Sequence, residues 1–400
     1  MNAKRKVISA YFFAELARTM YFISISWILY DITEDATYTG MLVGLGFLPG
    51  VFLNFVFGVL VDRWNRKRLA FIAMATASLV MSCTILLSAS NGFLPWIIFV
   101  THMVLQATGS LFRPAIQAFI AELFSKEQLP HIFSANGAAG VSGGLTGALL
   151  GGVLTGLGSP LLALLVVLFS FNLAAVAVGI TKPSETRVIH NPSHTSAWHD
   201  LLSGFAYARQ QPLLLGLFAM MLIGQLVFHS SVGFLSVYTK SILHGGATLY
   251  GLLDASLSIG GILAGAAGGW WWSIHQRHFA VYAFLMMVAG LVIVGLFPDR
   301  IAAFIGVLFI GLGTTWIRVL LQSMQQMITE ASYHGRMASF RMVLNQGSVA
   351  LGTPIIGLAA SQYGANMVYI VLLAPVTIGL VLSIYLARDT HFQQTVEHSA

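Results

Sequence analysis

Several charged residues lie inside long apolar stretches of the chain, where a charge is costly. Glu15 and Arg18 are three residues apart in the first stretch, and Arg113 and Arg318 lie in two others. Residues at i and i+3 share one face of a helix, and ionisable groups inside a membrane are functional candidates. A carboxylic acid beside guanidinium groups could couple proton binding to anion binding, because protonation of the acid releases the guanidinium.

Polar residues accompany these charges at helical spacing. We predict that Glu15 couples protons and that the substrate is bound by Arg18, Arg113, Arg318, Gln106, Gln225, His229 and Gln322. Asp254, near an end of its apolar stretch, is an outer gate, a second proton-coupling site or an acid at the membrane interface. An alternative is that Glu15 and Arg18 form a structural pair, while Arg113 binds Glu122 or a backbone carbonyl.

The apolar stretches predict the elements that position these residues. The chain is 57% hydrophobic and 8% charged, with a mean hydropathy of +0.81, and about 20 apolar residues cross a membrane core of about 30 Å. We therefore predict an all-α integral membrane protein with twelve spans, which leaves no room for a soluble catalytic domain. The spans are expected at 7–30, 38–61, 69–89, 94–121, 133–155, 161–180, 213–238, 249–272, 279–297, 301–327, 340–361 and 366–386.

The basic residues predict the orientation of these spans. Most of the 20 Lys and Arg residues lie in loops on one side, and only Lys240 and Arg300 lie in loops on the other. Because basic loops remain in the cytoplasm, both termini are expected there, in a cell inner membrane. The pI of about 9.5 has the same origin, so it gives no argument for a nucleic-acid partner. Trp270–Trp272 is expected to anchor a span at the interface.

A polar segment at 181–212 divides the spans into six and six. We predict an N-terminal bundle at 1–180, a cytoplasmic linker, and a C-terminal bundle with a short tail at 213–400. Within the linker, Trp198–Arg209 is expected to be an amphipathic helix on the inner membrane surface. The linker histidines at 190, 194 and 199 fit a solvated loop better than a metal site, and no cofactor is expected beyond the proton gradient.

The hairpin between the second and third spans carries the most specific motif, GVLVDRWNRKR at Gly58–Arg68. It resembles the signature loop of the major facilitator superfamily, G-x-L-x-D-R-x-G-R-K/R. Asn65 replaces the usual Gly, which we expect the turn to tolerate because Asn also accepts positive φ. The resemblance extends to the span count and the division into six and six. It implies two pseudo-symmetric six-helix bundles, spans 1, 4, 7 and 10 lining a central cavity, and a gating role for Gly58, Asp62, Arg63 and Arg66, with Gly58 packed against span 11.

A looser motif lies in the fifth span. Gly147–Gly152 resembles the G-P-x-x-G-G antiporter motif of exporters in that superfamily, with Ala148 in place of the proline. It implies gating roles for Gly147, Gly151 and Gly152; the alternative is a helix that is simply close-packed. The segments Arg113–Gly137 and Trp198–Leu214 are similar to the branch containing macrolide and siderophore exporters.

Together these features predict a proton-coupled antiporter that exports a small amphiphilic, anionic molecule, such as a siderophore or drug, by rocker-switch alternating access. Its expected partners are the small-molecule substrate, protons and membrane lipids, and the expected assembly is a monomer. An importer or a lysolipid flippase of the same fold is the alternative, and a membrane sensor without transport is another. An enzyme is disfavoured because the chain lacks a zinc-ligand pair, a Ser/His nucleophile and a phosphate-binding Gly loop.

Overall fold

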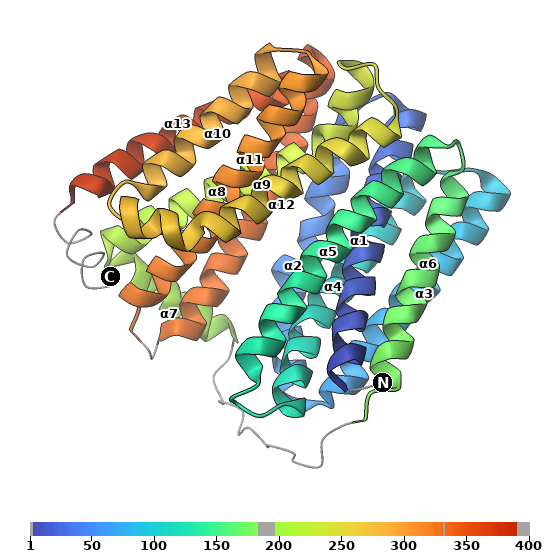
Figure 1. The fold of residues 1–400 in the computed structure, drawn as a ribbon, viewed down its shortest axis with the longest axis horizontal. Helices are drawn as coiled ribbons and strands as arrows, with labels where there is room; N and C mark the ends of the chain where they lie inside the picture. The colour runs from blue at the N-terminus through green and yellow to red at the C-terminus, as the bar shows by residue number, and fades with distance from the viewer. Residues whose placement is uncertain (1–2, 183–196, 331–332, 390–400) are drawn as a thin grey trace. The chain divides into compact units, whose positions relative to one another are not determined.

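A computed structural model describes residues 3–182, 197–330 and 333–389, with all side chains in these ranges except those at 55, 62, 197–202 and 335. The elements in the described part of the chain are thirteen α-helices (Figure 1). Twelve of these are long and apolar enough to cross a membrane. The prediction of an all-α protein with twelve spans is therefore confirmed.

The helix bounds follow the predicted spans closely. The first six helices are α1 (Ala3–Thr33), α2 (Ala36–Arg63), α3 (Arg66–Asn91), α4 (Pro95–Leu123), α5 (Leu129–Gly156) and α6 (Pro160–Gly179). The shorter α7 (Ala197–Arg209) follows in the linker. The remaining helices are α8 (Pro212–Ser241), α9 (Ala247–His275), α10 (Phe279–Leu296), α11 (Arg300–Ile328), α12 (His334–Tyr363) and α13 (Met367–Arg388).

The chain divides into two compact units. Each unit includes a short segment of a helix whose remainder belongs to the other unit. The first unit consists of Met1–Glu34, Leu45–His194 and Gly245–Leu252. The second consists of Asp35–Gly44, Thr195–His244 and Leu253–Ala400. The start of α2 therefore belongs to the second unit, and the start of α9 to the first.

In the first unit, α1 lies beside α5 and also packs on α4 and α6 (Figure 1). Glycines of α5 allow the close approach: a Cβ at Gly147 would lie 2.5 Å from the carbonyl oxygen of Leu16. At Gly151 a Cβ would lie 3.1 Å from the carbonyl oxygen of Met20. Small residues let helix backbones approach in this way. Gly147 and Gly151 therefore fix the position of α1, whereas their gating role stays a prediction.

The third glycine of the predicted antiporter motif contacts a different helix. A Cβ at Gly152 would lie 2.8 Å from the Cα of Gly251, in the segment of α9 that belongs to the first unit. The Thr248 hydroxyl, one turn earlier, donates to the carbonyl of Gly152 at 3.4 Å. The glycine-rich face of α5 thus packs against two helices, along most of its length.

In the second unit, α8 packs against α11, α12 and α13, and the linker helix α7 packs on α12. The Tyr207 and Tyr333 rings stack with centroids 4.1 Å apart, and the rings of Phe205 and Phe340 meet at 5.9 Å. Helix α7 therefore has a protein partner; its position on a membrane surface stays a prediction.

The tryptophan run of α9 combines an exposed residue with a packed one. Trp270 is 63% exposed, as an interfacial anchor would be. Trp271 instead stacks on the buried Trp316 of α11, with centroids 4.9 Å apart. Trp271 therefore has a packing partner in α11 that the sequence did not reveal, and the anchoring role of the run stays a prediction.

The glycine contacts predict the effect of one added methyl group. Gly147→Ala should lower the free energy of unfolding by about 1–3 kcal/mol, because its Cβ meets backbone that cannot rotate away. Gly144→Ala is the matched control, since a Cβ there lies 3.5 Å from the Thr19 hydroxyl, an ordinary contact. Denaturation of the purified protein in detergent measures both. Equal stability of the two variants would contradict this account of the helix contact.

Candidate functional site

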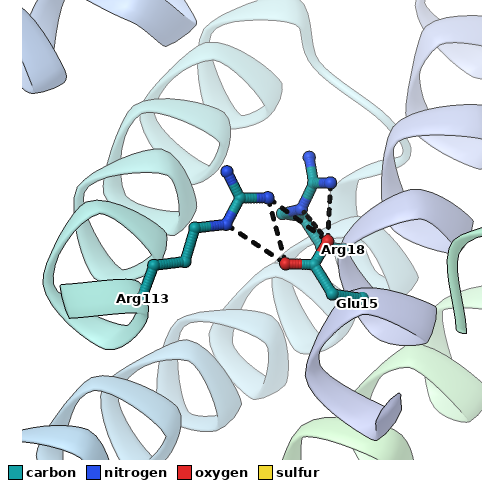
Figure 2. A network of polar contacts seen from close by, with 3 residues as sticks. All are labelled: Glu15, Arg18 and Arg113. Carbon is teal, nitrogen blue, oxygen red and sulfur yellow. Dashed lines mark hydrogen bonds and ion pairs between the residues drawn. The ribbon is translucent and has the colours of Figure 1, made fainter. Parts of the chain in front are cut away.

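A carboxylate shared by two guanidinium groups forms the candidate site (Figure 2). Arg18 donates to Oε2 of Glu15 from Nε at 2.9 Å and from Nη2 at 2.7 Å. Arg113 donates to Oε1 from Nε at 3.1 Å and from Nη2 at 3.0 Å, and Nη2 also contacts Oε2 at 3.2 Å. Charge-assisted hydrogen bonds of this kind are the strong ones in proteins.

The acid is buried and the two bases are not. The Glu15 side chain is 9% exposed, while those of Arg18 and Arg113 are 41% and 46% exposed. Within the described residues, no hydrogen bond is made by Nη1 of either arginine. One negative and two positive charges leave the cluster with a net charge of +1. The cluster therefore presents open N–H donors and an excess positive charge, which suit a carboxylate or a phosphate.

Two helices position this cluster. Glu15 and Arg18 project from one face of α1, and Arg113 reaches them from α4. We expected Arg18, Arg113 and Arg318 to surround Glu15. Arg18 and Arg113 do contact it, while the place of Arg318 beside them and the roles of all four residues in coupling and binding stay predictions. The alternative partner for Arg113 was wrong: Glu122 instead accepts a hydrogen bond from Nη1 of Arg66 at 2.6 Å.

Two aromatic stacks flank the cluster along α1 and α4, and the sequence reasoning missed both. Tyr11 stacks on Phe112 at 6.3 Å, one turn before Glu15. Tyr21 stacks on His102 at 5.9 Å, one turn after Arg18. The available signal was the spacing of Tyr11 and Tyr21 around the Glu15–Arg18 pair on α1.

Gln106 lies one turn from His102 on α4 and is half-buried. A Cβ at Gly46 would lie 3.3 Å from the Gln106 amide nitrogen, so Gln106 lies where α4 and α2 approach closely. Its role as a substrate ligand stays a prediction.

The other predicted ligands lie in the second unit. Gln225 Nε2 and His229 Nε2 are 2.7 Å apart on α8. The Arg318 guanidinium carbon lies 5.8 Å from the ring centroid of Phe228, within the range of a cation–π contact. Gln322 is half-buried on α11. The binding roles of Gln225, His229, Arg318 and Gln322 stay predictions.

Two further observations concern the second unit. Asp254 is 5% exposed, which does not fit an acid reaching toward the membrane interface; a role in proton coupling stays a prediction. The sequence reasoning also missed the contact between Arg341 Nη1 and Gln325 Oε1, at 3.0 Å. Gln325 is itself buried, so this contact joins α11 to α12 inside the unit.

The hairpin between α2 and α3 is built differently from the expectation. Asn65 has φ −66° and its side chain accepts a hydrogen bond from the backbone N–H of Arg68 at 2.9 Å. The expected positive φ is therefore wrong, and Asn65 is tolerated because it is an N-cap of α3. No described atom of the first unit beyond its own helix comes within 4 Å of a Cβ at Gly58; its packing against span 11 stays a prediction.

The remaining gating residues divide into three cases. Arg66 is tied to α4 by the ion pair with Glu122 described above. Arg63 is exposed. The side chain of Asp62 lies outside the described residues, as do His190 and His194 and the side chain of His199. Within the described part of the chain, no group of three His, Cys, Asp or Glu residues could hold a metal ion.

Residues 7–242 match the family model of the Major Facilitator Superfamily. The chain belongs to this superfamily. Comparison with curated proteins gave no match. The matched region covers the whole first unit except its short segments at either end, and it includes the cluster and the hairpin.

Solved structures of transporters share the fold. A bacterial homologue of the human lysosomal transporter Spinster is 12% identical, with a TM-score of 0.76, over 99% of this chain and 98% of that one. The nucleoside transporter NupG is 14% identical, with a TM-score of 0.75, over 99% of both chains. An auto-inhibited peptide transporter of the POT family is 11% identical, with a TM-score of 0.73, over 98% of this chain and 96% of that one.

These findings establish the general class of the protein. It is a multi-pass membrane transporter of a small-molecule substrate, and it is not an enzyme. Because the sequence identities are low, the similarity to these solved structures establishes the fold alone.

The cap at Asn65 predicts how the hairpin responds to substitution. Asn65→Ala should lower the free energy of unfolding by about 1 kcal/mol, because the N–H of Arg68 loses its acceptor. Asn65→Gly, which restores the superfamily residue, should cost only a few tenths of a kcal/mol. Denaturation in detergent compares the two. An Asn65→Gly variant that is the less stable of the pair would contradict the capping role.

Proposed function

We propose that this protein is a proton-coupled secondary active transporter of a small organic anion, with Glu15, Arg18 and Arg113 as its coupling site. The observation that carries the proposal is the sharing of one buried carboxylate by two half-exposed guanidinium groups. The substrate class follows from the same geometry, because guanidinium groups bind carboxylates and phosphates bidentately.

The coupling rests on competition for the same N–H groups. When Glu15 is ionised, its carboxylate accepts the hydrogen bonds that an anionic substrate needs. When Glu15 is protonated, this competitor loses its charge and two positive charges remain for the substrate. Proton and anion therefore favour each other's binding, and this linkage is reciprocal.

The sign of this linkage bears on the direction of transport. An alternating-access protein carries in the same direction two ligands that favour each other's binding, because the doubly loaded state is the one that reorients. With an inward proton gradient this mechanism gives uptake. It favours the importer alternative over the antiport and the siderophore or drug export predicted from the sequence, which rested on a motif that lacks its proline at Ala148.

We further propose that the protein lies in the inner membrane of its cell, with both termini in the cytoplasm. The support is the asymmetry of Lys and Arg between the loops on the two sides of the spans. In this orientation the Arg66–Glu122 ion pair lies at the cytoplasmic ends of α3 and α4.

The linkage predicts how anion binding depends on pH. For an anion found by its thermal stabilisation of the purified protein, among di- and tricarboxylates and organic phosphates, affinity should rise as pH falls. The limit for one linked proton is about tenfold per pH unit. Calorimetric titration at several pH values measures this slope, which should vanish in Glu15→Gln. Affinity that falls as pH falls would favour antiport and contradict the proposal.

The coupling also predicts a separation between two transport assays. In proteoliposomes, Glu15→Gln should abolish accumulation of the anion driven by a proton gradient, because the variant cannot release a proton. Exchange of labelled for unlabelled anion at equal pH should continue. Glu122→Gln is the matched control: it also removes an acid paired with an arginine, but outside the cluster, and should retain driven accumulation. Driven accumulation that survives Glu15→Gln would exclude Glu15 from coupling.

A further inference from the structure

His102 of α4 is a buried polar ring for which the coupling site gives no role. It is 3% exposed, and its ring stacks on Tyr21 at 5.9 Å and 16°. The ring of Phe22, also on α1, lies at 5.9 Å. His102 makes no hydrogen bond with any described residue, and its Nδ1 is buried without a partner. The hydroxyl of Tyr21 is also buried and has no hydrogen-bond partner among the described residues.

Two adjacent polar groups without partners are unusual in a protein interior. Buried side-chain donors and acceptors nearly always have a hydrogen-bond partner in protein or ordered water, and the exceptions call for an explanation. Water that reached this stack would supply hydrogen-bond partners for Nδ1 of His102 and for the hydroxyl of Tyr21. The pair thus marks a polar position inside the first unit.

The backbone of α2 leaves space for the His102 ring because it has a glycine at that point. A Cβ at Gly46 of α2 would overlap His102 Nε2, so only a glycine fits against this ring nitrogen. Gly46 is itself buried. The imidazole therefore lies between α1 and α2, with one nitrogen against the backbone of α2.

The charges around His102 connect it to the cluster. The titratable or charged groups that face it are Arg18, which interacts with it electrostatically, and Tyr21, both from α1; Gly46 of α2 contributes none. Arg18 in turn holds Glu15. Burial disfavours the charged form of the ring, so we take it as the neutral imidazole. A neutral imidazole has one donor nitrogen and one acceptor nitrogen.

We propose that His102, together with Tyr21, is a proton relay to Glu15. The inference rests on the proposed coupling role of Glu15. A proton binds the acceptor nitrogen of His102 while the proton on the other nitrogen leaves, so that the ring stays neutral and changes tautomer. Water and the Tyr21 hydroxyl, which gains one proton as it loses another, carry the proton onward to a carboxylate oxygen of Glu15. The ring returns to its first tautomer with the next proton.

The test separates proton movement from substrate movement, with an organic anion that binds the purified protein as the probe. In proteoliposomes, His102→Gln should slow uptake driven by a proton gradient by about tenfold or more. Equal-pH exchange of labelled anion, which needs no net proton movement, should keep its rate. Tyr21→Phe keeps the ring stack and should slow driven uptake alone. His131→Gln, at an exposed histidine of α5, is the matched control and should change neither rate.

Chemical rescue gives the second measurement. His102→Ala leaves a space into which added imidazole should bind and restore driven uptake, which a purely structural role would not permit. Equal slowing of both assays in His102→Gln, without rescue of His102→Ala, would overturn the relay, as would unchanged driven uptake. If His102→Gln does not fold, Tyr21→Phe decides: unchanged driven uptake overturns the proposal. If Glu15→Gln itself retains driven uptake, it is the coupling site that fails.

Discussion

The attraction between the Glu15 carboxylate and two guanidinium groups is the constraint on which the first unit depends. A lone carboxylate in apolar surroundings would be strongly disfavoured, so Arg18 and Arg113 must reach it from two helices. That requirement fixes the rotation of α1 and the distance between α1 and α4. Glycines on α5 then permit α1 to lie close enough for the carboxylate to be buried while the guanidinium groups keep part of their surface.

Burial of the acid suits proton coupling, and exposure of the bases suits the binding of a second anion. A buried acid changes its protonation state only when the surrounding contacts change, which makes it suitable for coupling. Exposed bases keep donors for a second anion, and they can exchange one acceptor for another at little cost. A cluster in which all three groups were buried would be a structural ion pair, and one in which all were exposed would be screened by water.

The sequence was sufficient for the spans and for the principal cluster, because both depend on strong local signals. Apolar stretches of about twenty residues form helices when they cross a membrane, because their backbone hydrogen bonds must be made within the segment. An acid and a base at i and i+3 then share a helix face. It was insufficient where the partner came from another helix without a charge to mark it. His102 over Tyr21, Trp271 on Trp316, and Arg341 with Gln325 depend on helix rotation. The Asn65 cap was missed because the superfamily pattern suggested a glycine conformation at a position that is extended.

The half-exposed guanidinium groups of Arg18 and Arg113 have a consequence for the resting protein. A site with excess positive charge and open N–H donors does not stay bare in a saline medium, since small inorganic anions are always at hand. Chloride is the most abundant of these in most biological fluids, and it accepts hydrogen bonds from guanidinium without forming a bidentate pair. Chloride would therefore compete with the proposed organic anion for these donors, and the apparent affinity of that anion would depend on the kind of salt around the protein as well as on its concentration.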